Sequence, residues 1–238
     1  MRVIKGEIFA WQGHVDRLRQ GLAAFELECP SGLLARCIQT AKEAGEDVLL
    51  RLTVSGGEAP RGLLVDEKRQ PQVHIQAWPY RPLSHALALH TLDWPLGGMA
   101  RTAKFTGDYA FTIRLLHRAR REGTLPEGEQ ALFTHQGELL GMETANILLL
   151  LDGEWLTPDS EALLPGVVRG ALLDAGVVRA CQCPVDWLQV CDAMAVCNSG
   201  CFVRPVAKVN GRSLDVHADR FVSLLEVLRG KPGVPAQL

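Results

Sequence analysis

Three segments from Lys104 onward combine residue types that could do chemistry. Lys104 precedes a segment with helical spacing, and a lysine amine can attack an aldehyde and then carry a proton. The proline turn Leu164-Pro-Gly166 leads into another helical segment, so the amides of Gly166, Val167 and Val168 can point at an anion. A third segment, Cys197-Asn-Ser199, is a turn after an apolar strand. The spacing of the three segments, read together, is specific.

The first third of the chain reads as a small α/β unit that would position part of such a site. Val3–Phe9 alternates apolar and polar residues around a Lys5-Gly6 turn, which predicts strand structure. Helical spacing covers His14–Glu26, and Ser31 is expected to cap a second helix that runs to Ala44. Further strands are expected at Asp47–Ser55, from Arg61 to Val65, and at Gln72–Trp78.

Two close prolines in Pro79-Tyr-Arg-Pro82 oppose regular structure and predict a linker at residues 81–86. We therefore expect a small N-terminal α/β domain at 1–80 and a larger, β-rich α/β domain at 87–238. The second domain would contain the following segments. They are a strand at Ala86–Leu92, a helix at Gly107–Arg121, two strands within Gln130–Leu151 joined at His135–Gly137, a helix from Gly166 to Gly176, and a strand pair around Ala195–Val209. The tail Lys231–Leu238 is expected to fray.

Composition restricts the class of protein. The chain has 238 residues, 47% of them hydrophobic, and a formal net charge of -2, so no basic face argues for nucleic acid. The longest apolar run, Ile147–Leu151, is too short for a membrane helix, and the N-terminus lacks the regions of a secretion signal. A cytoplasmic location is expected, with a small molecule or another chain as partner.

The cysteines also fit a reducing compartment. There are seven of them, an odd number, in apolar or strand-like contexts that suit free thiols. Cys181-Gln-Cys183 lacks the CxxC spacing of a redox or zinc pair, and no nearby histidine completes a ligand set. We expect no metal site.

Read together, the motifs resemble the class IV, or fold type IV, pyridoxal-phosphate enzymes. This family includes branched-chain and D-amino-acid aminotransferases and 4-amino-4-deoxychorismate lyase. The most specific signal is Thr157-Pro158 followed by Leu164-Pro-Gly-Val-Val-Arg169, at its spacing after Asn146. The resemblance reaches back to His14-x-x-Arg17-Leu18 and covers nearly the whole chain. It implies a two-domain α/β (α+β) fold, pyridoxal 5'-phosphate as cofactor, and a homodimer.

The resemblance also assigns roles to individual residues. Lys104 holds the position of the lysine that binds the cofactor aldehyde; the alternative is a solvated surface lysine. Tyr109 holds the position of a phenol that hydrogen-bonds the ring oxygen, and Asn146 that of a framework residue behind the ring. Arg17 and Ser199 would join the amides of Gly166, Val167 and Val168 at the phosphate. Each residue also has an ordinary structural interpretation. Arg17 would be a helix residue paired with Asp16 or Glu26, and Tyr109 would be a residue of an amphipathic helix. Ser199 would be a turn former, and Arg169 would be a helix residue near the site or an ion-pair partner.

The sequence departs from the family pattern in two places. The family has a glutamate five residues before the asparagine, where it keeps the pyridine nitrogen protonated, but that position is Gly141 here. The nearest carboxylate is Glu143, which would lie on the same strand face and could take the role. The alternatives are a cofactor held with a weaker electron sink, or a member of the family that has lost the cofactor. The family also begins with about thirty further residues that line the substrate pocket, so this N-terminus is expected to be shortened or its start to be assigned late.

Two loop segments favour the lyase within the family. Thr53–Gly57 followed by Arg61-Gly-Leu63, and Val196–Ser199 before Arg204-Pro-Val206, look more like 4-amino-4-deoxychorismate lyase. That enzyme releases pyruvate to give 4-aminobenzoate for folate synthesis, with Lys104 as base and then acid. Arg61 could bind a substrate carboxylate or be an ordinary loop arginine. The alternatives are an aminotransferase for branched-chain or D-amino acids, and a degenerate, non-catalytic member that serves as a dimeric scaffold or small-molecule binder.

Overall fold

The computed structural model describes residues 1–58, 70–82, 86–95 and 104–236, which form two compact units. The first unit contains the described residues up to Pro82 and those from Gly230 to Ala236. The second contains the described residues from there to Arg229. The sequence had placed residues 87–238 together, so the C-terminal segment is grouped differently in the structure. The mixed α/β fold predicted from the sequence is confirmed.

The first unit is an antiparallel sheet covered by helices. Its strand order is β2-β1-β3-β4, with β1 at Arg2–Ile4, β2 at Glu7–Ile8, β3 at Asp47–Ser55 and β4 at Gln72–Pro79. Helix α1 spans Trp11–Ala23 and α2 spans Leu33–Ala44. Val48 and Leu50 alternate on β3 and pack against the buried Cys37 and Ala41 of α2. The strand expected from Arg61 to Val65 lies outside the described residues.

Two expectations for this unit were wrong in detail. Ser31 does not cap α2: the residue before the helix is Gly32, with a φ of 68°, and no side chain of a described residue caps the helix there. The left-handed backbone that glycine allows takes the place of a serine cap. The tail is not frayed over its described part, because Gly233 lies against the backbone of β2 and Phe9 and its amide donates to Glu7 Oε2 at 3.4 Å.

The second unit is built on a larger sheet. Its strand order in the described residues is β10-β9-β8-β11-β12-β5-β6-β7, and β13 pairs with β12. The bounds are β5 at Leu87–Asp93, β6 at Gln130–His135, β7 at Glu138–Met142, β8 at Asn146–Leu151, β9 at Glu154–Pro158, β10 at Arg179–Cys181, β11 at Ala193–Asn198, β12 at Phe202–Val209 and β13 at Arg212–Ser213. The region expected as two strands is three, because a tight turn, closed by a 2.9 Å bond from the Met142 amide to the Ala145 carbonyl, separates β7 from β8.

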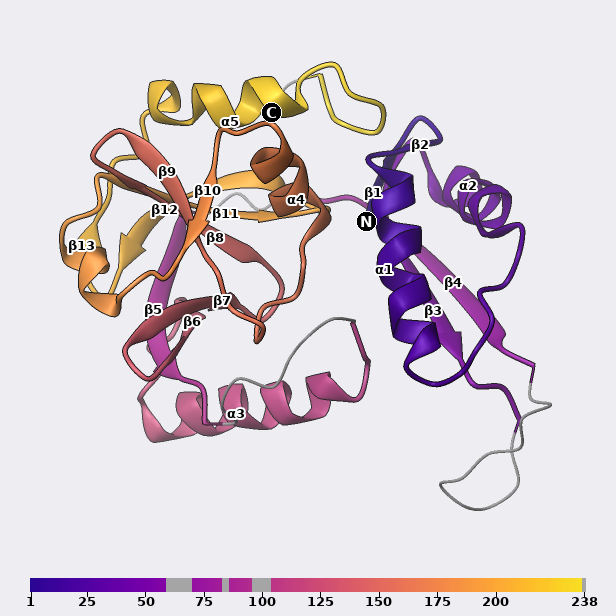
Figure 1. Cartoon of the computed structure of the whole chain (residues 1–238), viewed down its shortest axis with the longest axis horizontal. Coiled ribbons are helices and arrows are strands. Elements are labelled where there is room, and N and C mark those ends of the chain that lie inside the picture. Colours follow the sequence, from indigo (N-terminus) through magenta and orange to yellow (C-terminus); the bar gives the residue numbers. More distant parts are fainter. Residues whose placement is uncertain (59–69, 83–85, 96–103, 237–238) are drawn as a thin grey trace. The chain divides into compact units, whose positions relative to one another are not determined.

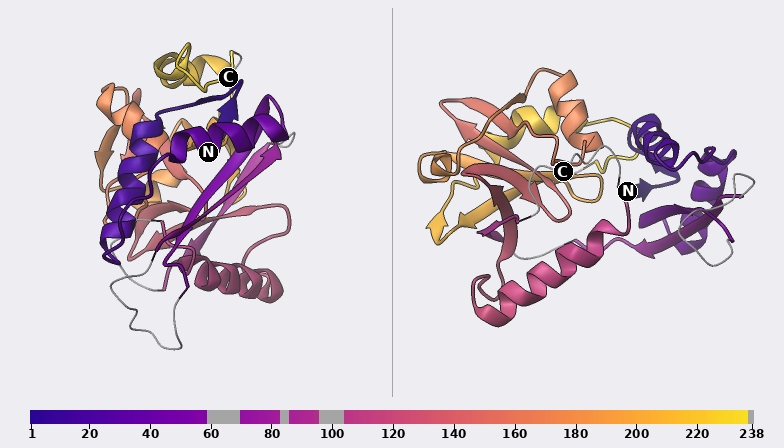
Figure 2. Two further views of the ribbon diagram at one scale, coloured as in Figure 1. Left: turned by 90° about the vertical axis from the view of Figure 1, so that its right-hand side faces the viewer. Right: turned by 60° about the horizontal axis from the view of Figure 1, so that its bottom comes forward.

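Helices cover this sheet on opposite sides (Figure 1). Helix α3 (Asp108–Glu122) lies on one side and α5 (Val222–Leu228) on the other, as the turned views also show (Figure 2). Beneath α3, the buried Trp94 ring makes edge contacts with Phe111 and Phe133, at centroid distances of 5.4 and 4.9 Å. Helix α4 (Val167–Asp174) contacts β11 and α5, and two short 3-10 helices, η1 (Val185–Gln189) and η2 (Ala218–Phe221), complete the unit. None of the described helices has the length and apolar character needed to cross a membrane.

Candidate functional site

Asn146 connects the start of β8 to the loop before α4. Its side chain is buried, and its Nδ2 donates to the Leu164 carbonyl at 3.1 Å. A Cβ added to Gly166 would overlap the Asn146 Oδ1 atom. This close approach explains why position 166 is glycine: any side chain there would push the loop away from β8.

The start of α4 offers backbone amides to an anion. Gly166 has an extended backbone before the helix, and the 2.8 Å bond from the Gly170 amide to its carbonyl begins the helical ladder. The first amides of a helix have no acceptor within it, and no described side chain caps this one. The amides of Gly166, Val167 and Val168, which we call the anion cradle, therefore carry partial positive charge toward the loop.

Arg169 fixes the anion cradle against β9. Its Nε donates to Thr157 Oγ1 at 3.2 Å and its Nη2 to the Pro158 carbonyl at 2.8 Å. Thr157 is fully buried and donates in turn to the Ile147 carbonyl of β8 at 2.8 Å. Burial lowers the pKa of Arg169 from its ordinary value, and the nearby Asp159 opposes this. Arg169 thus holds α4 by hydrogen bonds to β9, a positioning role that the motif alone did not distinguish from an ion pair.

Ser199 lies in the hairpin between β11 and β12, close to the same strand ends. The hairpin is closed by Asn198, whose Oδ1 accepts from the amides of Gly200 and Cys201 at 2.8 and 2.9 Å. Asn198 Nδ2 also donates to the Thr144 carbonyl at 3.2 Å, and Cys197 pairs with Asn146 across the sheet. Sequence reasoning missed the role of Asn198, although an Asn-Ser-Gly sequence after a strand is a turn signal.

Glu143 brings a carboxylate into the turn between β7 and β8. Its Oε2 is buried and has no hydrogen-bond partner among the described residues. Burial raises the pKa of Glu143 above its ordinary value, and a hydrogen bond from its own backbone and the charge of Arg120 oppose this only in part. A buried carboxylate oxygen without a donor is costly, so this position suits a ligand that brings a donor or a positive charge.

Gly141 could not simply be replaced by the glutamate of the family pattern. A Cβ there would lie 3.1 Å from the Ala145 carbonyl oxygen and 3.4 Å from Leu163 Cδ2. The tight turn after β7 closes over this position, which leaves Glu143 as the carboxylate of the turn. A side chain at residue 141 would therefore require Ala145 or Leu163 to shift by a few tenths of an ångström.

The structure brings together four of the predicted segments: the Glu143 turn, Asn146, the anion cradle and the Ser199 hairpin. We call them the strand-end cluster. Lys104 and Tyr109 form a separate pair at the start of α3, with Lys104 Nζ 5.9 Å from the centroid of the Tyr109 ring. Lys104 is exposed and Tyr109 half-buried, and neither has a hydrogen bond or ion pair to the strand-end cluster within the described residues. The cofactor role of Lys104 stays a prediction.

Two predicted site residues remain, Arg17 and Arg61. Arg17 is half-buried on α1, in the first unit. Arg61, the predicted substrate residue, lies outside the described residues.

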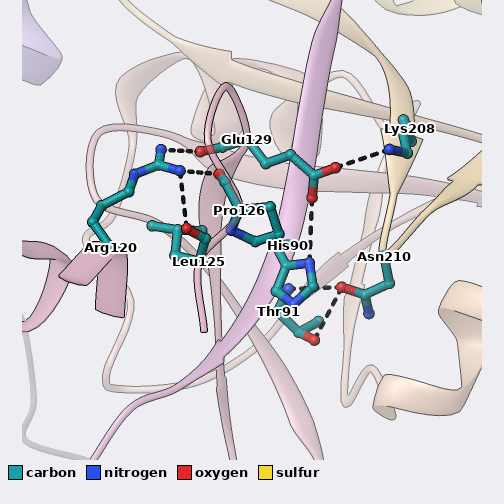
Figure 3. A network of polar contacts seen from close by, with 8 residues as sticks. All are labelled: His90, Thr91, Arg120, Leu125, Pro126, Glu129, Lys208 and Asn210. Carbon is teal, nitrogen blue, oxygen red and sulfur yellow. Dashed lines mark hydrogen bonds and ion pairs between the residues drawn. The ribbon is translucent and has the colours of Figure 1, made fainter. Parts of the chain in front are cut away.

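A paired carboxylate that sequence reasoning also missed is Glu129 (Figure 3). It is 8% exposed, accepts from Lys208 Nζ at 3.0 Å and contacts His90 Nδ1 at 3.2 Å. The hydrogen bond from Lys208 holds the pKa of Glu129 below its ordinary value, with His90 adding to this. Its backbone carbonyl also accepts from Arg120, so Glu129 joins α3, β5 and β12. Both carboxylate oxygens of Glu129 have a partner, Lys208 for one and His90 for the other, which indicates a structural role.

Comparison with known proteins supports the family. The amino-transferase class IV family profile matches residues 1–209. No curated protein matches the chain. Similar solved structures include a Legionella pneumophila protein with the provisional name 4-amino-4-deoxychorismate lyase (TM-score 0.79, 20% identity, 95% of this chain and 87% of that chain). They also include the branched-chain aminotransferase from Thermoproteus uzoniensis with norvaline (TM-score 0.79, 20% identity, 96% and 82%).

A third similar structure is a hypothetical aminotransferase from Mycobacterium tuberculosis in its PLP-bound form (TM-score 0.76, 22% identity, 95% and 85%). At these identities the neighbours establish the fold, and the profile match over most of the chain establishes the family. The chain belongs to the class IV aminotransferase family of pyridoxal-phosphate-dependent enzymes.

Proposed function

We propose that this protein binds pyridoxal 5'-phosphate and carries out the reaction of 4-amino-4-deoxychorismate lyase, releasing pyruvate to give 4-aminobenzoate. One observation supports the proposal most: an anion cradle and a buried carboxylate oxygen without a donor belong to the same strand-end cluster. The cofactor has an anionic phosphate at one end and a basic ring nitrogen elsewhere. The residues present therefore fit the group.

The chain would hold the cofactor by complementary charge. The amides of the anion cradle, the hydroxyl of Ser199 and the guanidinium of Arg17 would bind the phosphate. Glu143 would accept a hydrogen bond from the protonated ring nitrogen, which would supply the donor that its Oε2 lacks. Tyr109 would donate to the ring oxygen, and Asn146 would keep the cradle loop in place through Leu164.

Lys104 would be the catalytic residue. The bound cofactor supplies an electron sink for the substrate's α-carbon. Lys104 Nζ would bind the cofactor aldehyde before substrate arrives. It would then take the proton from the substrate α-carbon and return a proton to the three-carbon fragment that becomes pyruvate. Arg61 is proposed to bind a substrate carboxylate.

The lyase is placed first because the segments at Thr53–Gly57 and Val196–Ser199 resemble that branch of the family, and because the Legionella neighbour has a matching name. A class IV aminotransferase is the second candidate, since the Thermoproteus aminotransferase superposes with the same TM-score. In that reaction Lys104 would move the proton between the substrate α-carbon and the cofactor. A cytoplasmic homodimer with a place in folate synthesis is proposed with the lyase.

Absorbance spectroscopy tests cofactor binding. Purified protein with added pyridoxal phosphate should develop the visible band of a protonated Schiff base, and Lys104→Ala should abolish it. Lys42→Ala, at an exposed lysine of the first unit, is the matched control and should keep the band. A band that persists in Lys104→Ala would remove Lys104 from this role. No band in the wild-type protein would favour the degenerate, non-catalytic alternative.

Two product assays separate the reactions. Aminodeoxychorismate should give 4-aminobenzoate and pyruvate if the lyase proposal is correct. An amino donor with 2-oxoglutarate should give glutamate if the protein is an aminotransferase. Sedimentation of the loaded protein tests the homodimer.

A further inference from the structure

The two sulfur atoms of Cys181 and Cys183 lie 3.8 Å apart. Their sequence spacing is not that of a CxxC redox pair, and spacing alone gave no reason to couple them. A disulfide needs a sulfur-sulfur distance of about 2.05 Å. The folded chain therefore holds the two thiols within a short side-chain movement of bond formation.

The fold fixes the two cysteines from different sides of the second unit. Cys181 ends β10, which runs parallel to β9, and its carbonyl accepts from the Asp159 amide at 2.8 Å. Cys183 lies beside β7, where its carbonyl accepts from the Leu139 amide at 2.7 Å. The next residues continue this pairing, with the Val185 amide donating to Gly137 at 2.8 Å. Backbone hydrogen bonds on both sides of Gln182 therefore keep the thiols facing each other.

The two thiols differ in access. Cys181 is half-buried, whereas Cys183 is 1% exposed and packs in the apolar core of the unit. Cys183 Sγ donates to the Cys181 carbonyl at 3.5 Å. Burial, and then the neighbouring Cys181, raise the pKa of the Cys183 thiol. A solute can therefore reach Cys181, while Cys183 reacts only with a group already held beside it.

We propose that Cys181 and Cys183 form a redox-active dithiol that closes to a disulfide at the expense of a low-molecular-mass disulfide such as oxidised glutathione. Cys181 is the sulfur that first reacts with the external disulfide. Cys183 is the resolving sulfur, which then attacks Cys181. The inference is independent of the proposed enzyme reaction, because it requires neither cofactor nor substrate.

The exchange balances in two steps. Cys181, as thiolate, attacks one sulfur of oxidised glutathione, forms a mixed disulfide and expels one glutathione thiolate. Cys183 loses its proton and attacks Cys181 Sγ, which forms the Cys181–Cys183 bond and expels the second glutathione thiolate. The two thiol protons pass to the two glutathione thiolates. The protein dithiol is oxidised and one external disulfide is reduced.

The test uses the full chain in a series of glutathione buffers from reducing to oxidising. After acid quenching and alkylation of free thiols, trypsin and a protease that cuts before aspartate release Ala180–Val185, which contains just these two cysteines. Oxidation should leave this fragment unalkylated and about 2 Da lighter than its reduced form, for the two hydrogens lost. In the native protein the Cys181–Cys183 disulfide should form at a glutathione ratio about tenfold less oxidising than in urea, because the fold holds the two sulfurs together.

Single variants test the assigned order. Cys183→Ser should accumulate glutathione on Cys181, and Cys181→Ser should leave the buried Cys183 unmodified in the native state. Cys29→Ser, in the first unit, is the matched control and should leave formation of the Cys181–Cys183 disulfide unchanged. The proposal is overturned if the native fragment stays fully alkylated throughout the series, stops at the mixed disulfide, or closes no more readily than in urea. Glutathione on Cys183 in Cys181→Ser would overturn the order of attack.

Discussion

At the scale of single residues, the site depends on close approaches more than on charged groups. Gly166 shows this best, because it is an uncharged residue in a turn and yet leaves no room for one carbon atom beside Asn146. The hydrogen bond from Asn146 to Leu164 keeps the anion cradle close to β8. The shape of the cradle therefore depends on the smallest residue in it.

We expect Gly166→Ala to weaken both the fold and cofactor binding. The added carbon would displace Asn146 or the loop, at a cost of about 1–3 kcal/mol in the free energy of unfolding. The affinity for pyridoxal phosphate should fall at least roughly tenfold, since one hydrogen-bonding arrangement is lost. Gly170→Ala is the matched control, because a Cβ there meets no atom within 4 Å. It should be neutral or stabilising in urea unfolding, and equal effects at the two positions would contradict the close approach.

Glu143 should show opposite effects on stability and on function. Its pKa is raised by burial, so the folded apoprotein favours the protonated form, and this contribution to stability is lost as pH rises above the ordinary range of a glutamate. Glu143→Gln should therefore unfold at a higher temperature than the wild type near neutral pH. The gain in the free energy of unfolding should be no more than about 1 kcal/mol and should shrink near pH 4. Cofactor affinity should fall roughly tenfold.

Glu161→Gln, at an exposed carboxylate, is the control for Glu143 and should change neither quantity. Thermal unfolding of the apoprotein between pH 4 and 8 and titration with pyridoxal phosphate measure the two effects. A lower apoprotein stability in Glu143→Gln at pH 7 would mean that the backbone hydrogen bond and the charge of Arg120 outweigh the cost of burying this carboxylate.

At the scale of elements, local pattern predicted many segments and failed where tertiary contacts decide. The segment Asp47–Ser55 was predicted residue for residue, because alternation and β-branched residues mark one sheet face. The turn of Glu143–Ala145 was missed, since it lies between two largely apolar strands and contains no glycine or proline. The short strand β10 follows from its parallel pairing with β9, a non-local contact that a local pattern does not contain.

The candidate site also contains residues that the sequence could suggest and supporting residues that only tertiary contacts reveal. The resemblance to the family proposed Glu143, Asn146, the anion cradle and Ser199 as site residues, and the fold brings their segments together. The supporting residues, Thr157, Arg169 and Asn198, act through bonds to backbone carbonyls and amides of distant strands. Such bonds depend on the register of the sheet, so the sequence shows the ligands of a site more readily than their supports.

The Glu129 network should stabilise the junction of α3, β5 and β12 in a pH-dependent way. Because its pKa is lowered in the folded state, its contribution is complete above the ordinary glutamate value near pH ~4.3 and is lost as pH falls below that value. Glu129→Gln should cost about 1 kcal/mol at pH 7, since Lys208 is partly exposed to solvent. Urea unfolding at pH 7 and pH 3 measures this, and the difference from wild type should shrink at the lower pH.

Glu127→Gln provides the control for Glu129. Glu127 is exposed and two residues away, so its substitution should leave stability unchanged at both pH values. If Glu129→Gln lost as much stability at pH 3 as at pH 7, the effect would come from packing and the ion pairs would contribute little.

At the scale of the whole molecule, the chain does not divide into two consecutive pieces. The first unit is completed by the described residues from Gly230 to Ala236, which follow the last helix of the second unit. The first unit therefore includes a segment that is separated from the rest of it in sequence by the second unit. The sequence showed no sign of this, because the segment has little apolar periodicity and is held by backbone contacts.

Gly233 tests this dependence with an internal control. Gly233 and Gly230 have nearly the same positive φ, 73° and 74°, so alanine pays a similar conformational cost at either position. Only at Gly233 would the new carbon overlap backbone atoms, those of Phe9 and of β2, while at Gly230 it meets nothing within 4 Å. We expect Gly233→Ala to cost about 1–3 kcal/mol more than Gly230→Ala, and to increase proteolysis within the first unit before the second. Thermal unfolding and timed digestion measure this; equal effects of the two variants would mean that the C-terminal segment does not hold the first unit together.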